Sequence, residues 1–244
     1  MIAEVSIVIP IYNEALILDE LISRLITTVS PLTKKYELIL VNDCSTDDTK
    51  EVLENLKLTC DKLKVISLKK NMGQFLATVA GLHQELYKHI IIMDGDLQDN
   101  PEDIKSLIKE YNNRDQANLT IFASKENRKE SHFIQLATLI YNGLIKLRDK
   151  NWPSNIGSFL LTSRSTIDDA LKSFDNINVT NANISVLINH FSEEVKTIPI
   201  EKRARYDKVS RIGNLGLFKE AIGSLILLCK LRISKRGNIE RNIK

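Results

Sequence analysis

The chain has 244 residues, which is enough for one large α/β domain or two small ones, and 43% of them are hydrophobic. That composition is ordinary for a globular protein. No stretch reaches the roughly 20 apolar residues that a bilayer-spanning helix needs. The N-terminus runs directly into a strand pattern, so we expect no secretory signal peptide.

The net charge of +3 hides an asymmetry along the chain. Residues 202–244 carry 12 Lys or Arg and 3 Asp or Glu, near +9, whereas residues 1–201 carry 22 and 28, near −6. A basic tail on a mildly acidic body predicts an anionic partner, either a membrane or a nucleic acid. The cysteines, Cys44, Cys60 and Cys229, are odd in number and lack metal-ligand spacing, which predicts free thiols in a reducing cytosol.

Strand and helix patterns alternate through the first half of the chain. Apolar runs predict strands at 5–10, 36–43, 64–68, 89–94 and 118–124. Segments with helical spacing lie between them, at 13–29, 45–58 and 73–86, and a further helix starts near Pro101. Alternation of this kind predicts an α/β fold with a parallel sheet and right-handed crossovers.

The alternation weakens after Ser124. The second half predicts an amphipathic helix at 133–147, a strand at 156–163, a helix at 180–191 and an edge strand at 194–201. No repeat or low-complexity linker divides the chain. We therefore expect one main domain over residues 1–212 and a C-terminal segment over 213–244.

Polar residues follow the first, second and fourth predicted strands. Ligands of open parallel sheets lie at the carboxyl ends of the strands, so these residues mark the functional edge. The chain has neither the GxxxxGK[ST] of a P-loop nor a GxGxxG after the first strand. The polar residues at this edge are Tyr12, Asn13, Glu14, Asn42, Asp43, Asp94 and Asp96.

The stretch "IIIMDGDLQD" (90–99) ends a buried strand in carboxylates. A turn after the strand lets Asp94 and Asp96 face one ligand, and Mg²⁺ often binds one or two protein carboxylates plus substrate phosphates. Gln98 adds a neutral carbonyl oxygen. The alternative is a solvated turn in which Asp99 caps the following helix. At the second strand, Asp43 is placed to accept hydrogen bonds from a base or ribose, whereas Ser45, Thr46 or Asp47 caps the next helix.

Four blocks in order resemble the family 2 glycosyltransferases of the GT-A fold, in particular the dolichyl-phosphate mannose synthase-like branch that uses polyprenyl phosphates. They are "VSIVIPIYNE" (5–14), "ELILVNDCSTDDT" (37–49), "LKKNMGQFLATVAGL" (68–82) and "IIIMDGDLQDNPEDI" (90–104). The resemblance covers residues 4–212. It implies a Rossmann-like, mostly parallel sheet flanked by helices and a nucleotide-diphosphate sugar as donor.

The resemblance also implies roles for individual residues. Asp94 and Asp96 match the catalytic DxD motif and, with Gln98, would hold Mg²⁺ or Mn²⁺ against the diphosphate. The positions implied for nucleotide-sugar binding are Pro10, Tyr12, Asn13, Glu14, Val41, Asp43, Asn71 and Gly95. The positions implied for phosphate binding, in "KENRKES" and "RYDKVSR", are Lys125, Arg128, Arg205, Ser210 and Arg211.

Two departures from the family pattern bear on the chemistry. Asn42 replaces the first aspartate of the family's "DDGS", and Ser158 replaces an aspartate proposed to lie near the reacting centre. A serine cannot act as a general base at neutral pH. A phosphate monoester, with a second pKa of about 6, needs no such base. This favours a polyprenyl phosphate as the acceptor; the resemblance, with the lack of a candidate nucleophile for double displacement, implies an inverting transfer. The alternatives are transfer to a sugar hydroxyl of a surface polysaccharide, or nucleotide-sugar binding without turnover.

The C-terminal segment predicts a basic amphipathic helix over 215–231. Apolar Phe218, Ile222, Leu225, Ile226 and Cys229 share one face, with Lys219, Glu220 and Lys230 on another. Helices of this kind lie in the membrane interface, so we expect peripheral attachment at the cytoplasmic face of the membrane. The alternative is packing on the sheet or in a homo-oligomer. We expect no nucleic-acid partner, because the tail has almost no aromatic residues for base stacking.

Overall fold

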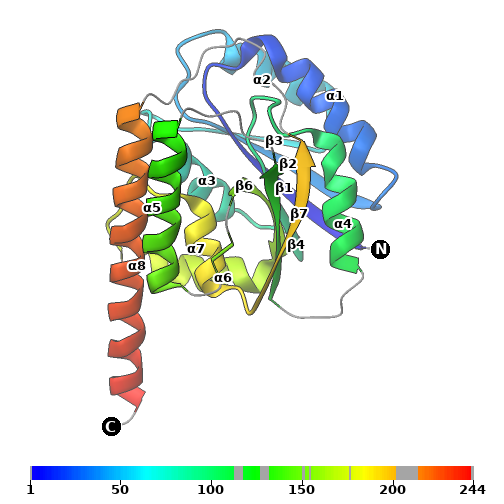
Figure 1. Ribbon diagram of the computed structural model, residues 1–244. Helices are drawn as coiled ribbons and strands as arrows, with labels where there is room; N and C mark the ends of the chain where they lie inside the picture. The colour runs from blue at the N-terminus through cyan, green and yellow to red at the C-terminus, as the bar shows by residue number, and fades with distance from the viewer. Residues whose placement is uncertain are drawn as a thin grey trace.

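A seven-stranded sheet forms the centre of the molecule, in the strand order β3-β2-β1-β4-β6-β5-β7 (Figure 1). The computed structural model describes residues 2–112, 118–126, 132–149, 152–153, 155–175, 177–201 and 214–242. The strands are β1 Glu4–Ile11, β2 Lys35–Asn42, β3 Leu63–Ser67, β4 His89–Ile92, β5 Leu119–Glu126, β6 Ile156–Ser163 and β7 Glu194–Glu201.

Helices cover both faces of this sheet (Figure 1). They are the 3₁₀ turns η1 Ala15–Ile17 and η2 Pro101–Asp103, and the α-helices α1 Leu18–Val29, α2 Thr49–Thr59, α3 Gln74–Leu82, α4 Ile104–Asn112, α5 His132–Arg148, α6 Arg164–Phe174, α7 Ile184–Phe191 and α8 Asn214–Asn242. The predicted α/β class with a helix-flanked sheet is confirmed.

The sheet is mostly parallel, as predicted, with one reversal. Strand β1 pairs in parallel with β2 and β4, β2 with β3, and β5 with β7. Strand β6 runs antiparallel to both β4 and β5. The carboxyl ends of the parallel strands therefore meet at one edge, and β6 enters the sheet from that edge.

Alternate residues of the strands feed two separate hydrophobic cores. In β1, Val8 points into the core under α3, α6 and α7, whereas Ile7 and Ile9 point into the core under α1 and α4. All three are fully buried. Burial on both sides explains why the sequence of this strand, "VSIVIP", is almost continuously apolar.

Helix α6 was missed by the sequence analysis, although its signals are present. Ser163 caps it by accepting a hydrogen bond from the Thr166 N–H, and Ile167, Ala170, Leu171 and Phe174 recur at helical spacing and are buried. The apolar strand directly before it conceals where one element ends and the next begins.

Helix α8 is longer than predicted and lies beside α5 along one side of the molecule (Figure 1). Its inner face buries Leu227, Leu228 and Leu231, whereas Phe218, Ile222 and Ile226 are exposed. Apolar residues therefore cover both the packed face of α8 and part of its outer face. No helix in the described ranges combines the length and apolarity that crossing a bilayer requires.

Candidate active site

The ends of β1, β2 and β4 lie side by side and are joined by backbone hydrogen bonds. The Asp43 N–H donates to the Ile11 carbonyl at 2.8 Å, and the Met93 N–H donates to the Val8 carbonyl at 3.3 Å. Because β1 lies between β2 and β4, the loops after all three strands open onto the same edge. The sequence prediction that these loops form one site edge agrees with this arrangement.

The loop after β1 is fixed against the loop after β2. Asn13, at a left-handed φ of 56°, donates its backbone N–H to Ser45 Oγ at 3.0 Å and accepts the Thr46 N–H on Oδ1 at 2.7 Å. The Glu14 N–H donates to Thr49 Oγ1 at 2.9 Å. Asn13 is therefore a structural link between the two loops, and it leaves the neighbouring Tyr12 and Glu14 at the site edge.

Asp43 lies at the strand end as predicted, but its carboxylate faces the protein. It is 3% exposed, and its two oxygens accept the backbone N–H groups of Met72 and Gly73 at 2.6 and 2.8 Å. Burial raises the pKa of Asp43, and the two amide hydrogen bonds lower it. The contacts of Asp43 shape the loop before α3, in which Gly73 takes a φ of 83° that favours glycine.

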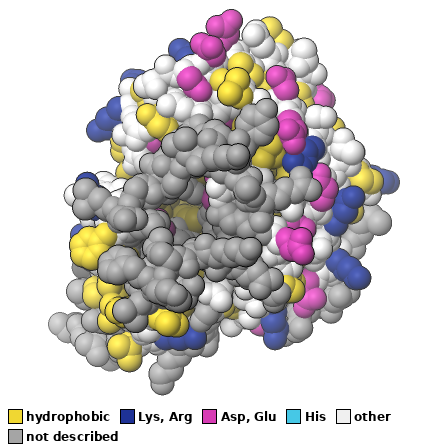
Figure 2. All heavy atoms as spheres, turned by 45° about the horizontal axis from the view of Figure 1, so that its top comes forward, with side chains coloured by type: hydrophobic (Ala, Val, Ile, Leu, Met, Phe, Trp, Pro, Cys, Tyr) yellow, Lys and Arg dark blue, Asp and Glu magenta, His cyan; other side chains and the backbone are white. Residues whose placement is uncertain are grey.

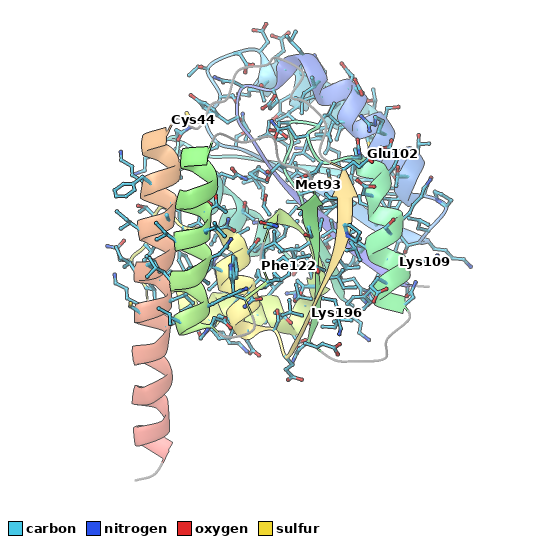
Figure 3. The ribbon with its side chains drawn as sticks, viewed as in Figure 1. Cys44, Met93, Glu102, Lys109, Phe122 and Lys196 are labelled. Carbon is cyan, nitrogen blue, oxygen red and sulfur yellow. The ribbon has the colours of Figure 1, made fainter. Side chains whose placement is uncertain are left out.

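The turn after β4 carries the two aspartates of the DxD pattern. Met93, labelled in the middle of Figure 3, is the last residue of the fully buried run, and both Asp94 and Asp96 are partly exposed. Gly95 between them packs against β1, because a Cβ built there would lie 2.3 Å from Ile11 Cδ1. The Gln98 N–H donates to Asp96 Oδ1 at 3.1 Å, and Leu97 takes a left-handed φ of 57°.

Asp94 is held by side chains from two other elements. Gln74, the first residue of α3, donates its amide to Asp94 Oδ1 at 2.6 Å, and the Ser158 hydroxyl in β6 donates to the same oxygen. Ser158, the departure from the family pattern, is therefore at the site. Gln74 was missed, although its place in the first turn of a helix that starts at the sheet edge could have indicated it.

The donors in this turn suit a hard divalent cation. Asp94, Asp96 and Gln98 offer two carboxylates and one amide carbonyl, all partly exposed. Within the described part of the chain, no three His, Cys, Asp or Glu side chains group closely enough to hold a cation alone. Mg²⁺ and similar ions often bind one or two protein carboxylates and complete their shell with substrate phosphates and water, so the residues present fit such an ion.

A further carboxylate reaches this region from the C-terminal helix. Glu220 accepts a hydrogen bond from Asn183 Nδ2 at 3.0 Å and is partly buried. Burial raises the pKa of Glu220, the Asn183 amide lowers it, and the negative charge of Asp94 raises it. The carboxylates of Glu220 and Asp94 therefore influence each other, although the sequence grouped Glu220 with Lys219 and Lys230 on a face apart from the apolar residues of its helix.

The remaining predicted site residues divide into two groups. Pro10 and Val41 are paired across β1 and β2 just before the site edge, and exposed Asn71 donates to the Asp43 carbonyl at 3.3 Å. The predicted phosphate-binding side chains, Lys125, Arg128, Arg205, Ser210 and Arg211, all lie outside the part of the chain whose side chains the structure describes.

Comparisons with known proteins agree with this geometry. Residues 6–171 match Glycosyl transferase family 2. The chain is 31% identical over 214 residues to undecaprenyl-phosphate 4-deoxy-4-formamido-L-arabinose transferase from Edwardsiella ictaluri, covering 87% of this chain and 64% of that protein. It is also 31% identical to the enzyme of that name from Klebsiella pneumoniae, over 200 residues, 82% of this chain and 59% of that one. The chain thus spans less than two thirds of either relative.

Among solved structures, the chain resembles glucosyl-3-phosphoglycerate synthase from Mycobacterium tuberculosis in complex with Mn²⁺, UDP-glucose and phosphoglyceric acid. The TM-score is 0.60 at 16% identity, covering 93% of this chain and 80% of that one. At this identity the similarity establishes the fold, which is the GT-A arrangement. The Mn²⁺ and the nucleotide sugar are properties of that complex.

Proposed function

This chain belongs to glycosyl transferase family 2, and we propose that it transfers a sugar from a nucleotide-diphosphate donor to a polyprenyl phosphate. The observation that carries the proposal is the Asp94–Gly95–Asp96 turn at the end of β4, held beside Gln74 and Ser158. The polyprenyl acceptor is supported by the two relatives at 31% identity, whose names specify undecaprenyl phosphate.

The donor would lie across the ends of β1, β2 and β4. In this proposal Tyr12, Glu14 and Asn71 line the nucleotide, and Asp43 maintains the shape of the adjoining loop. Asp94 and Asp96, with Gln98, would hold Mg²⁺ or Mn²⁺, which when bound neutralises the charge that develops on the departing nucleoside diphosphate. Gln74 and Ser158 orient the Asp94 carboxylate through their hydrogen bonds.

The acceptor chemistry follows from Ser158. An acceptor phosphate is largely dianionic at neutral pH, so its oxygen can attack the anomeric carbon without a protein base. The new carbon–oxygen bond forms as the bond from that carbon to the diphosphate oxygen breaks, and the nucleoside diphosphate leaves with the electron pair. A single displacement of this kind inverts the anomeric centre. Basic residues of the segments around Arg128 and Arg205–Arg211 are proposed to bind the acceptor or donor phosphates.

A membrane-facing surface would bring the lipid acceptor to this site. Helices α5 and α8 lie side by side, and Figure 2 shows exposed hydrophobic side chains along the same edge of the molecule. The exposed apolar residues on these two helices are Leu139, Ile140, Leu144, Leu147, Phe218, Ile222 and Ile226. With the basic residues of the tail, this α5–α8 surface has the composition of an interfacial anchor, and we propose contact with the cytoplasmic leaflet.

The test is a donor-consumption assay with and without lipid acceptor. Purified protein is incubated with a panel of UDP, GDP and related nucleotide sugars, Mn²⁺ and undecaprenyl phosphate in vesicles, and release of nucleoside diphosphate is measured. We expect release that depends on the lipid phosphate. Release that instead requires a glycan with a free hydroxyl would identify a sugar hydroxyl, and not a polyprenyl phosphate, as the acceptor. Binding of the nucleotide sugar without any release would indicate a nucleotide-sugar-binding protein.

A further inference from the structure

The C-terminal helix packs directly against the segment that precedes α7. A Cβ built on Gly223 would lie 1.3 Å from the Asn181 carbonyl oxygen, so the two backbones are in contact there and a larger residue does not fit. One residue on, Ser224 Oγ accepts the Asn183 N–H at 2.9 Å and donates to the Glu220 carbonyl at 2.8 Å. These contacts fix the first half of α8 relative to residues 181–183.

Glu220 is the charged group in this contact. Its Oε1 accepts the amide hydrogen of Asn183 at 3.0 Å, and Asn183 Oδ1 accepts the Ser185 N–H at 2.9 Å to cap α7. Both polar atoms of the Asn183 side chain are therefore used. The asparagine joins the carboxylate on α8 to the first turn of α7.

From α7 the hydrogen bonds continue to the metal-binding turn. Ser185 Oγ donates to the Gly157 carbonyl at 2.6 Å, and the next residue, Ser158, donates its hydroxyl to Asp94. Ser158 is therefore adjacent to the backbone carbonyl that binds the first turn of α7. A continuous series of contacts leads from Glu220 to Asp94.

The same segment also lies near the loop before Gln74. Asn181 Oδ1 lies 3.8 Å from the point where a Cβ on Gly73 would stand, directly before Gln74, which donates to Asp94. Residues 181–185 therefore adjoin both elements that supply hydrogen-bond donors to this carboxylate. Helix α8 contacts this segment at Gly223 and Ser224.

We propose that Glu220 is a positioning residue for Asp94, acting through Asn183 and α7 on the Ser158 donor and so on the affinity of the site for a divalent cation. The inference rests on the proposed function in one respect, the cation role of Asp94 and Asp96. With this role, α8 contributes to the site proposed to bind the nucleotide sugar, in addition to the membrane contact proposed for its outer face.

The test compares Glu220→Ala with Glu220→Gln in the full chain. Mn²⁺ alone is titrated and the free ion is followed by electron paramagnetic resonance. Loss of groups that orient metal ligands typically weakens affinity 10–100-fold, so we expect Glu220→Ala to raise the Mn²⁺ Kd about tenfold. Glu220→Gln keeps an oxygen that accepts from Asn183, so its Kd should stay within about threefold of the wild-type value. Glu54→Ala, on the exposed face of α2, is the control.

A swapped pair keeps the test decisive if Glu220→Ala does not fold. Asn183→Asp retains a cap for α7 but loses the amide donor, and adding Glu220→Gln restores the hydrogen bond with donor and acceptor exchanged. We expect the single variant to weaken Mn²⁺ binding and the double variant to recover it. A folded Glu220→Ala with wild-type Kd, or a double variant without recovery, overturns the inference. Absence of Mn²⁺ binding by the wild type, both alone and with a nucleoside diphosphate present, would instead refute the proposed cation role itself.

Discussion

The two sides of the Asp94 carboxylate are built differently. On the side of the proposed sugar-donor site, short loops follow neighbouring strands, and Asn13, Asp43 and Gly95 each contact an adjacent loop or strand. On the other side, Ser158 and Glu220 come from β6 and α8, which are far apart in the chain and meet through α7.

The difference lies in what holds each side together. A parallel sheet brings its strand ends to one edge through backbone pairing alone, so the donor side follows from the sheet order. The opposite side depends on helix packing and on particular side-chain hydrogen bonds, which a single substitution can change. We therefore expect substitutions on the sugar-donor side to cause either a large loss of activity or none, and substitutions on the other side to cause intermediate losses.

The largest effect is expected at the DxD turn. Asp96→Ala removes one of the two carboxylates proposed to hold the cation against the diphosphate, and we expect about a thousandfold loss of transfer rate. The melting temperature should change little, because Asp96 is partly exposed. Donor consumption under saturating Mn²⁺ measures the rate. Asp61→Ala, at an exposed turn, is the matched control, and a fully active Asp96→Ala protein would eliminate the metal role.

Two glycines compare the tightly packed strand-end turn with an exposed helix position through stability. Gly95→Ala would place a methyl group 2.3 Å from Ile11 Cδ1 in a buried strand, and overpacking of this kind costs about 1–3 kcal/mol. Gly143→Ala on α5 meets nothing within 4 Å, and alanine is favoured over glycine in a helix by up to about 1 kcal/mol. Urea unfolding should show a lower free energy of unfolding for the first and an equal or higher one for the second. A stable Gly95→Ala would mean that the turn can move away from β1.

The sequence alone predicts the part of the site that is built from the loops after successive strands. The strand–loop–helix alternation and the "MDGDLQD" turn predict the sheet edge and its carboxylates, since backbone pairing needs no knowledge of tertiary contacts. The sequence did not predict the reversed direction of β6, since a buried apolar strand has the same pattern in either direction. Nor did it place Glu220 at the site, because helical periodicity grouped it with Lys219 and Lys230, and only the close contact at Gly223 brings it inward.

The outer face of α8 should contribute a moderate effect on membrane binding. Ile222→Glu places a charge in the middle of the exposed apolar residues of the α5–α8 surface. The variant loses one apolar side chain that would enter the membrane and gains a charge, and together these changes should weaken binding to anionic vesicles at least about tenfold. Leu58→Glu makes the same kind of change on α2, at a residue that is 85% exposed, and should leave vesicle co-sedimentation unchanged. Equal loss in both variants would mean that binding is nonspecific and that α5 and α8 have no special role.

The smallest effect is expected at Ser158, and it separates the two acceptor hypotheses. Ser158→Ala removes one of two donors to Asp94 while Gln74 remains, so a loss of about 1 kcal/mol, or about fivefold in kcat/KM, is expected. Ser23→Ala on the exposed face of α1 should have no effect. Ser158→Asp restores the carboxylate of the family pattern but sets it against Asp94. If the acceptor is a phosphate that needs no base, this variant should be slower than the wild type, because the added charge repels the acceptor anion. Faster transfer by the wild type to a sugar hydroxyl than to undecaprenyl phosphate would contradict the phosphate hypothesis.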